Sequence, residues 1–76
     1  MIHEHDSVVL SRSLPGYGLD IGDVGTVVHC YPGGGFAVEF MTLGGRTVAV
    51  VTLGPQDLRP VSETEVSHAR PLQGVR

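Results

Sequence analysis

A histidine and a cysteine stand side by side in "GDVGTVVHCYPGGGFAVEF", residues 22–40, just before a turn with three consecutive glycines. A thiol next to an imidazole base is a pairing that can make a nucleophile. Neighbouring residues of a strand point to opposite faces, however, so His29 and Cys30 cannot react through their adjacency alone. The pair by itself does not define a catalytic site.

Cys30 is instead predicted to be a small core residue, on one inward face with Val24 and Val28. On this assignment His29 and Tyr31 point outward near the hairpin. A β-bulge, which a glycine at position 25 permits, would reverse part of the assignment. A reactive thiol is the alternative interpretation of Cys30.

His3 and His5 in "HEHD" are the candidate metal ligands. A single strand would place both imidazoles on one face, which suits two ligands of one ion. Zinc usually takes three or four ligands, and His29, Cys30 or His68 could join only through the fold. The alternative is a solvated N-terminal segment. No metal or other cofactor is predicted.

The charge pattern argues against a nucleic-acid partner. The formal net charge is −3, and all five cationic side chains are arginines. Affinity for phosphates depends mainly on cationic contacts, and a basic stripe of Arg12, Arg46 and Arg59 would be needed. We expect Arg46 and Arg59 to pair instead with Glu39, Asp57 or acids of the long loop. The glycine-rich turn precedes a strand and lacks the helix N-terminus of a phosphate loop.

The length of 76 residues corresponds to one domain with a small core. A chain of this size buries only about 60% of its unfolded surface, whereas enzymes usually need pockets of about 300 Å³ or more. Catalysis is therefore not predicted. One cysteine and a polar N-terminus without signal-peptide features predict a cytoplasmic protein. The longest apolar run, residues 48–51, is far shorter than a membrane span.

Strands rich in Val, Thr, Phe and Tyr must position any site on this chain. No window of ten or more residues has helical periodicity, and glycines and prolines interrupt the chain too often for a long helix. Proline and positive-φ glycines predict tight hairpins within residues 32–35 and 43–45, and a 3₁₀ turn is expected at 55–58, with Leu58 in the core. The predicted strands are Ser7–Ser11, Val24–Tyr31, Phe36–Thr42, Arg46–Leu53 and Arg59–Val61.

The alternation of residues 36–41 predicts a core face of Phe36, Val38 and Phe40, with Glu39 toward water. Residues 8–10 and 48–51 are apolar on both faces, which implies a second covering surface, either the bent sheet itself or another chain. Such surplus apolar surface also predicts a homodimer.

The order of these elements, with a twelve-residue loop at 12–23, is that of a small five-stranded SH3-like barrel. The segment "IGDVGTVVHCY" followed by "FAVEF" resembles the Gly-Asp-x-Gly-x-Val pattern of KOW-type and nitrile-hydratase-β-type barrels. More specifically, "LPGYGL", "GDVGTVV", "VEF" and "TVAVVTL" within Glu4 to Val61 resemble short bacterial proteins catalogued as domain of unknown function 4926. The resemblance implies a fold but transfers no activity.

The domain prediction is a barrel over residues 1–61 and a mobile C-terminal tail over 62–76, where strand alternation stops. The predicted function is a non-catalytic protein-binding module, an accessory or immunity/antitoxin-like partner of a larger protein. A KOW-like nucleic-acid or ribosome-associated module and a metal-binding accessory protein are the alternatives. Tyr17 is the leading contact residue, because the long loop of such barrels borders the ligand groove, although its ring could instead cover one end of the barrel. The predicted partner-binding residues are Tyr17, Leu19, Asp20, Tyr31 and Met41.

Overall fold

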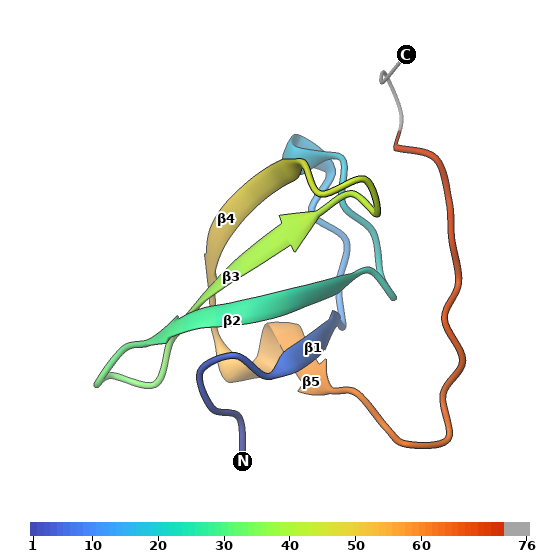
Figure 1. The fold of residues 1–76 in the computed structure, drawn as a ribbon. Coiled ribbons are helices and arrows are strands. Elements are labelled where there is room, and N and C mark those ends of the chain that lie inside the picture. Colours follow the sequence, from blue (N-terminus) through green and yellow to red (C-terminus); the bar gives the residue numbers. More distant parts are fainter. Residues whose placement is uncertain (73–76) are drawn as a thin grey trace.

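The computed structural model describes residues 1–72 and contains one bent sheet of five antiparallel strands (Figure 1). The predicted all-β class, the long loop after the first strand and the 3₁₀ turn before the last strand are confirmed. Neighbours in the sheet follow the order β4-β3-β2-β1-β5. The elements are β1 (Ser7–Leu10), the 3₁₀ helix η1 (Pro15–Tyr17), β2 (Val24–Cys30), β3 (Phe36–Met41), β4 (Thr47–Leu53), the 3₁₀ helix η2 (Pro55–Asp57) and β5 (Leu58–Pro60).

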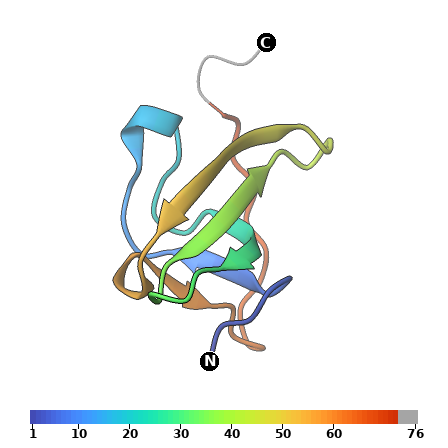
Figure 2. The same cartoon turned by 90° about the vertical axis from the view of Figure 1, so that its left-hand side faces the viewer.

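The sheet bends so that β3 and β4 lie across β1 and β5, as the view in Figure 2 shows. The core fills the space between these two halves. The edge strands β4 and β5 are joined by η2, and Leu58 is buried as predicted. The buried core residues are Val8, Leu10, Leu14, Leu19, Val27, Val38, Phe40, Val51, Leu53 and Leu58.

Strand β3 has the predicted alternation. Val38 and Phe40 are buried, and Phe36 packs against the core from a partly buried position. Glu39 points outward, where its carboxylate accepts a 2.7 Å hydrogen bond from the Thr47 hydroxyl. The inward residues of β3 therefore form the central wall of the core.

Strand β2 differs from the prediction because it contains a β-bulge. The register passes from Val27↔Val38 to His29↔Ala37, so Val28 has no partner on β3. Before the bulge the inward residues are Gly25 and Val27, and Val28 is exposed.

The prediction that Val24 and Val28 share the inward face is therefore wrong. A Cβ at position 25 would lie 2.6 Å from a Val38 methyl group, so only glycine lets the two strands pack this closely. Beyond the bulge the pattern is reversed, and Cys30 packs partly buried against the core.

Strand β1 is apolar on both faces, as predicted, and all of Val8, Val9 and Leu10 are buried. Val8 and Leu10 belong to the core, whereas Val9 lies on the other face between its cross-strand neighbours Val24 and Arg59. The neighbours on the same sheet thus supply the second cover of this strand.

The tail follows β5 without regular secondary structure over the part that is described. In Figure 1 it turns back and runs along one side of the sheet to the level of η1. Of the predicted mobile tail at 62–76, residues 73–76 lie outside the described residues, and mobility stays a prediction. Between residues 1 and 72, no helix is long and apolar enough to cross a membrane.

Candidate functional site

The long loop between β1 and β2 is folded on its own hydrogen bonds. Leu14 and Leu19 form an isolated bridge, with 2.9 and 3.2 Å hydrogen bonds in both directions, and their side chains are buried. Between them, η1 projects into solvent and ends at Gly18, which has a φ of 71°. The two leucines thus attach the loop to the core and leave its backbone turn at the surface.

A tight turn at residues 20–23 orients the carboxylate of Asp23. The Asp23 amide donates to the Asp20 carbonyl at 3.1 Å, and the Asp20 amide donates to Oδ2 of Asp23 at 2.8 Å. Gly22 adopts a φ of 93°, a conformation that glycine reaches without strain. The Asp23 carboxylate is therefore fixed beside the Gly18 carbonyl.

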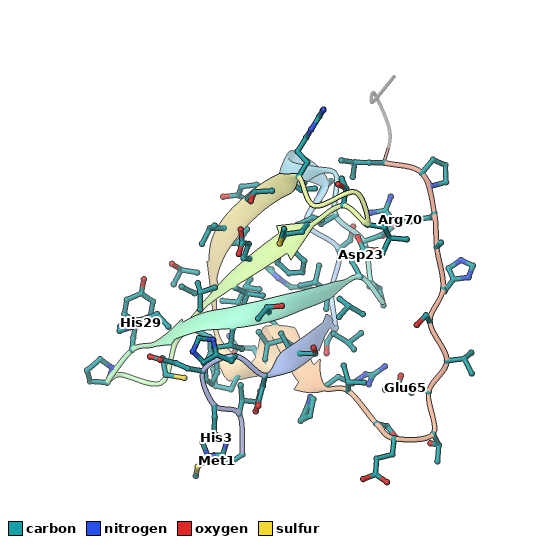
Figure 3. The ribbon with its side chains drawn as sticks, in the orientation of Figure 1. Met1, His3, Asp23, His29, Glu65 and Arg70 are labelled. Atoms are coloured by element: carbon teal, nitrogen blue, oxygen red, sulfur yellow. The ribbon has the colours of Figure 1, made fainter. Side chains whose placement is uncertain are left out.

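Arg70 of the tail occupies this position, as Figure 3 shows. Its Nε donates to Oδ1 of Asp23 at 3.0 Å, and its Nη2 donates both to Oδ2 and, at 2.9 Å, to the Gly18 carbonyl. The side chains of Arg70 and Asp23 are 32% and 20% exposed, respectively. A charge-assisted fork of this kind fixes direction as well as distance.

The ion pair changes the titration of Asp23. Partial burial alone would raise the pKa of Asp23. The hydrogen bonds from Arg70 and from the Asp20 amide, together with the Arg70 charge, outweigh burial and hold the pKa below its ordinary value of 3.8. The carboxylate is therefore ionised at neutral pH and attracts a cation.

The ion pair borders an open depression of about 510 Å³, which we call the loop pocket. Leu72 lies beside it, since a Cβ built on Gly18 would be 3.7 Å from Cδ1 of Leu72. Arg70 and Pro71 form one wall of this depression, and the acceptors that bind Arg70, the Asp23 carboxylate and the Gly18 carbonyl, lie at its edge. Its lining residues are Ser13, Pro15, Gly18, Leu19, Asp20, Arg70 and Pro71.

The five predicted partner-binding residues are not gathered in one place. Tyr17 is 51% exposed on η1 and precedes the lining residue Gly18 in the chain, but it does not itself line the loop pocket, whereas Asp20 is exposed in its lining. Leu19 also lines the pocket but is only 5% exposed, because its side chain belongs to the core. Its side chain therefore anchors the loop, and a contact between Leu19 and a partner stays a prediction.

The other two predicted contact residues lie outside the loop pocket. Tyr31 follows β2 at the end opposite Asp23, where its ring meets that of His29 edge to face at 4.6 Å. Met41 is half exposed at the end of β3, opposite Thr47. Of the five, the structure thus places Leu19 and Asp20 in the pocket lining, Tyr17 on the neighbouring η1, and Tyr31 and Met41 elsewhere on the surface.

The N-terminal histidines do not share a strand face. Residues 4 and 5 form a turn in which His5 has a φ of 73°, so the assumed strand geometry is wrong. His3 approaches Asp6 at 3.7 Å, whereas Glu4 approaches His29 at 3.6 Å. Within residues 1–72 no group of three or more His, Cys, Asp or Glu side chains could hold a metal ion.

The arginines have other partners than those predicted. Arg59 pairs with Glu65 of the tail through hydrogen bonds of 2.9 and 2.6 Å. Asp57 forms an ion pair with Arg12 instead, with 3.2 Å between Oδ1 and Nε. Sequence reasoning missed Arg70 altogether, because 47 positions separate it from Asp23 and no local pattern links the two. The sequence feature that could have drawn attention to this position was the Arg-Pro dipeptide at 70–71, in a tail that otherwise has low strand character.

The fold and the loop pocket define a small all-β domain whose surface holds an extended peptide segment. The chain belongs to the family described as Domain of unknown function (DUF4926), whose model matches residues 4–60. No curated protein and no solved structure matches the chain. The family match ends before the tail, so it includes Asp23 but not Arg70.

Proposed function

We propose that this chain is a non-catalytic protein-binding module that contacts its partner through the loop pocket. The observation that supports the proposal is that the loop already binds a segment of the tail at the edge of this pocket. Arg70 makes three hydrogen bonds to the loop, and the partly buried Leu72 lies beside Gly18. A surface that holds a segment of its own chain in this way has the donors, acceptors and shape to hold a segment of another protein.

The rim of the loop pocket supplies the additional contacts that a partner needs. Tyr17 offers a half-exposed aromatic ring, and Asp20 adds a second carboxylate beside Asp23. Tyrosine is enriched at protein interfaces because it combines a large apolar surface with a hydrogen-bonding group. We therefore place Tyr17 and Asp20 in the contact surface and Leu19 in the core beneath it.

The proposed role is that of an accessory or immunity/antitoxin-like subunit acting on a larger protein in the bacterial cytoplasm. The single cysteine is compatible with a reducing compartment. Copies of the chain are further proposed to associate through the exposed outer face of the sheet, where Met41 and Val50 are half exposed.

Affinity capture from a lysate of the native host tests the contact surface. The wild-type chain is compared with Tyr17→Ala, and Tyr31→Ala is the matched control because that tyrosine is similarly exposed, at 42%, at the other end of β2. We expect a protein that the wild type and Tyr31→Ala retain and Tyr17→Ala loses. Equal retention by all three chains, or no retained protein, contradicts the proposal.

A further inference from the structure

The tail is attached to the domain at two points and is exposed between them. Glu65 meets Arg59 close to the end of β5, and Arg70 meets Asp23 at the loop pocket. Residues 66–69, which lie between these two pairs, are exposed and have no regular secondary structure. In Figure 3 this stretch stands apart from the strands until it reaches Arg70.

Such an attachment is reversible on physical grounds. Ion pairs at the surface contribute little to stability, because water and salt compete with them. Beyond the hydrogen bonds of Arg70, the segment from Arg70 to Leu72 contributes only the partial burial of Leu72 beside Gly18 and no strand pairing. The tail can therefore leave the loop pocket without unfolding the sheet, whose core residues belong to positions 8–58.

We propose that the Asp23 carboxylate and the Gly18 carbonyl, at the edge of the loop pocket, are a receptor for an arginine-bearing segment of a partner protein, and that Arg70 of the chain's own tail occupies these acceptors as an intramolecular competitor. This inference rests on the proposed function and names both the partner's chemistry and its regulation. The seated tail defines the ligand as an arginine followed by proline and an apolar residue. A partner that presents this segment displaces Arg70 and gains contacts to Tyr17 and Asp20.

The acceptor geometry selects arginine over lysine. Nε of Arg70 donates a hydrogen bond to Oδ1 of Asp23, while Nη2 donates to Oδ2 and to the Gly18 carbonyl. A planar guanidinium matches this fork, whereas an ammonium group is a point charge that cannot present the same parallel donors. Asp20 strengthens the preference for a cation without specifying which one.

A partner protein fits the site better than the tail of a second copy does. A tail on a short connector reaches its own pocket at an effective concentration of about a millimolar. The tail of another copy brings the same contacts to the acceptors at a far lower effective concentration. A partner segment can add contacts at the rim, which allows it to compete.

The test uses a fluorescent peptide of residues 66–72, VSHARPL, titrated by anisotropy against full-length chains. Arg70→Ala removes the competitor, and Arg46→Ala on the β3–β4 hairpin is the matched control. We expect Arg70→Ala to bind the peptide several-fold more tightly than the wild type and Arg46→Ala do. Peptides with leucine or lysine in place of arginine should bind Arg70→Ala at least several-fold more weakly.

Equal affinity of the three chains, or of the arginine and leucine peptides, overturns the inference. A wild-type dimer in sedimentation that Arg70→Ala abolishes also overturns it, since the tail would then serve a second copy. The two proposals fail separately. If a lysate partner depends on Tyr17 but no peptide binds, the proposed protein-binding function stands and the arginine receptor is refuted.

Discussion

The sheet and the tail are stabilised in opposite ways. From β1 to β5, the side chains that hold the halves of the sheet together are apolar and buried, and Val27, Val38 and Phe40 are at most 2% exposed. The tail at residues 61–72 is attached instead by arginine–carboxylate pairs at the surface. Burial makes the sheet cooperative, whereas surface pairs respond to salt, pH and competitors. The comparison predicts that the two regions can be perturbed independently.

The largest effect is expected from Phe40→Ala, which removes the largest fully buried side chain of the core. Truncating a buried phenylalanine costs about 3–5 kcal/mol. A domain of this length has a total stability of about 4–11 kcal/mol, so the variant should be mostly unfolded or close to it. Thermal unfolding by circular dichroism measures the loss.

The control is Met41→Ala, the neighbouring residue on β3, whose side chain is half exposed. We expect a loss below about 1 kcal/mol for it, in the usual range for surface substitutions. Similar losses for both variants would mean that the core is not where the structure places it.

A smaller loss is expected from Gly25→Ala. Its new Cβ would lie 2.6 Å from Val38, 2.8 Å from Phe40 and 3.0 Å from the Glu39 carbonyl. Overpacking of this kind costs about 1–3 kcal/mol, or roughly 4–8 °C in Tm for each kcal/mol. Gly33→Ala, where no atom lies within 4 Å of the new Cβ, should leave Tm almost unchanged. A Gly25→Ala chain as stable as wild type would contradict the close packing of β2 on β3.

Strands β3 and β2 also show how far the sequence could predict the fold. The alternation of residues 36–41 correctly predicted the buried Val38 and Phe40, because a regular strand with one face in the core has a period of two. The bulge at Val28 could not be predicted in the same way. Its position appears only in the register between β2 and β3, where Val28 has no partner, and it leaves no periodic signal in the sequence of β2.

The candidate site was predictable only in part for a related reason. Asp20 of the pocket lining was predicted because the loop length and composition indicate an excursion between strands. Asp23 and Arg70 meet only after the tail has passed the whole sheet, and no spacing in the sequence indicates that they are close. The burial of Leu19 was not predicted, because an apolar loop residue can anchor the loop or face a partner, and the sequence does not distinguish the two.

Arg70→Ala should release the tail and leave the sheet intact. The substitution removes the hydrogen bonds from Arg70 to Asp23 and to the Gly18 carbonyl. A surface ion pair of this kind contributes about 0–1 kcal/mol to stability. We expect the backbone order of residues 68–72, measured by ¹⁵N relaxation, to fall to that of a flexible terminus. Amide signals of β1 to β5 should keep their positions, and Tm should change by only a few degrees.

Arg46→Ala is the control for this measurement, and it should leave the order of the tail unchanged. A tail that is equally ordered in Arg70→Ala would show that the ion pair does not hold it. A tail that is already fully flexible in the wild type would place the attachment elsewhere.

The smallest effect is a pH dependence confined to the tail. The pKa of Asp23 is lowered in the folded chain, so its contribution to stability is complete above the ordinary value of 3.8 and is lost as the pH falls through the lower folded value. Glu65 behaves alike, because hydrogen bonds from Arg59 and from the Ser62 amide lower its pKa to about 2. Tail order should therefore be constant between pH 7 and 5 and fall below pH 3.8.

Asp23→Asn separates the two carboxylates in this titration. The amide keeps one acceptor oxygen for the Asp20 backbone but carries no charge, so residues 68–72 should be weakly ordered at every pH. What pH dependence remains near residue 65 then belongs to Glu65. If the tail of Asp23→Asn still loses its order on acidification as the wild type does, Asp23 is not the group that holds Arg70. A contact other than Asp23 with Arg70 would then have to attach the tail to the domain.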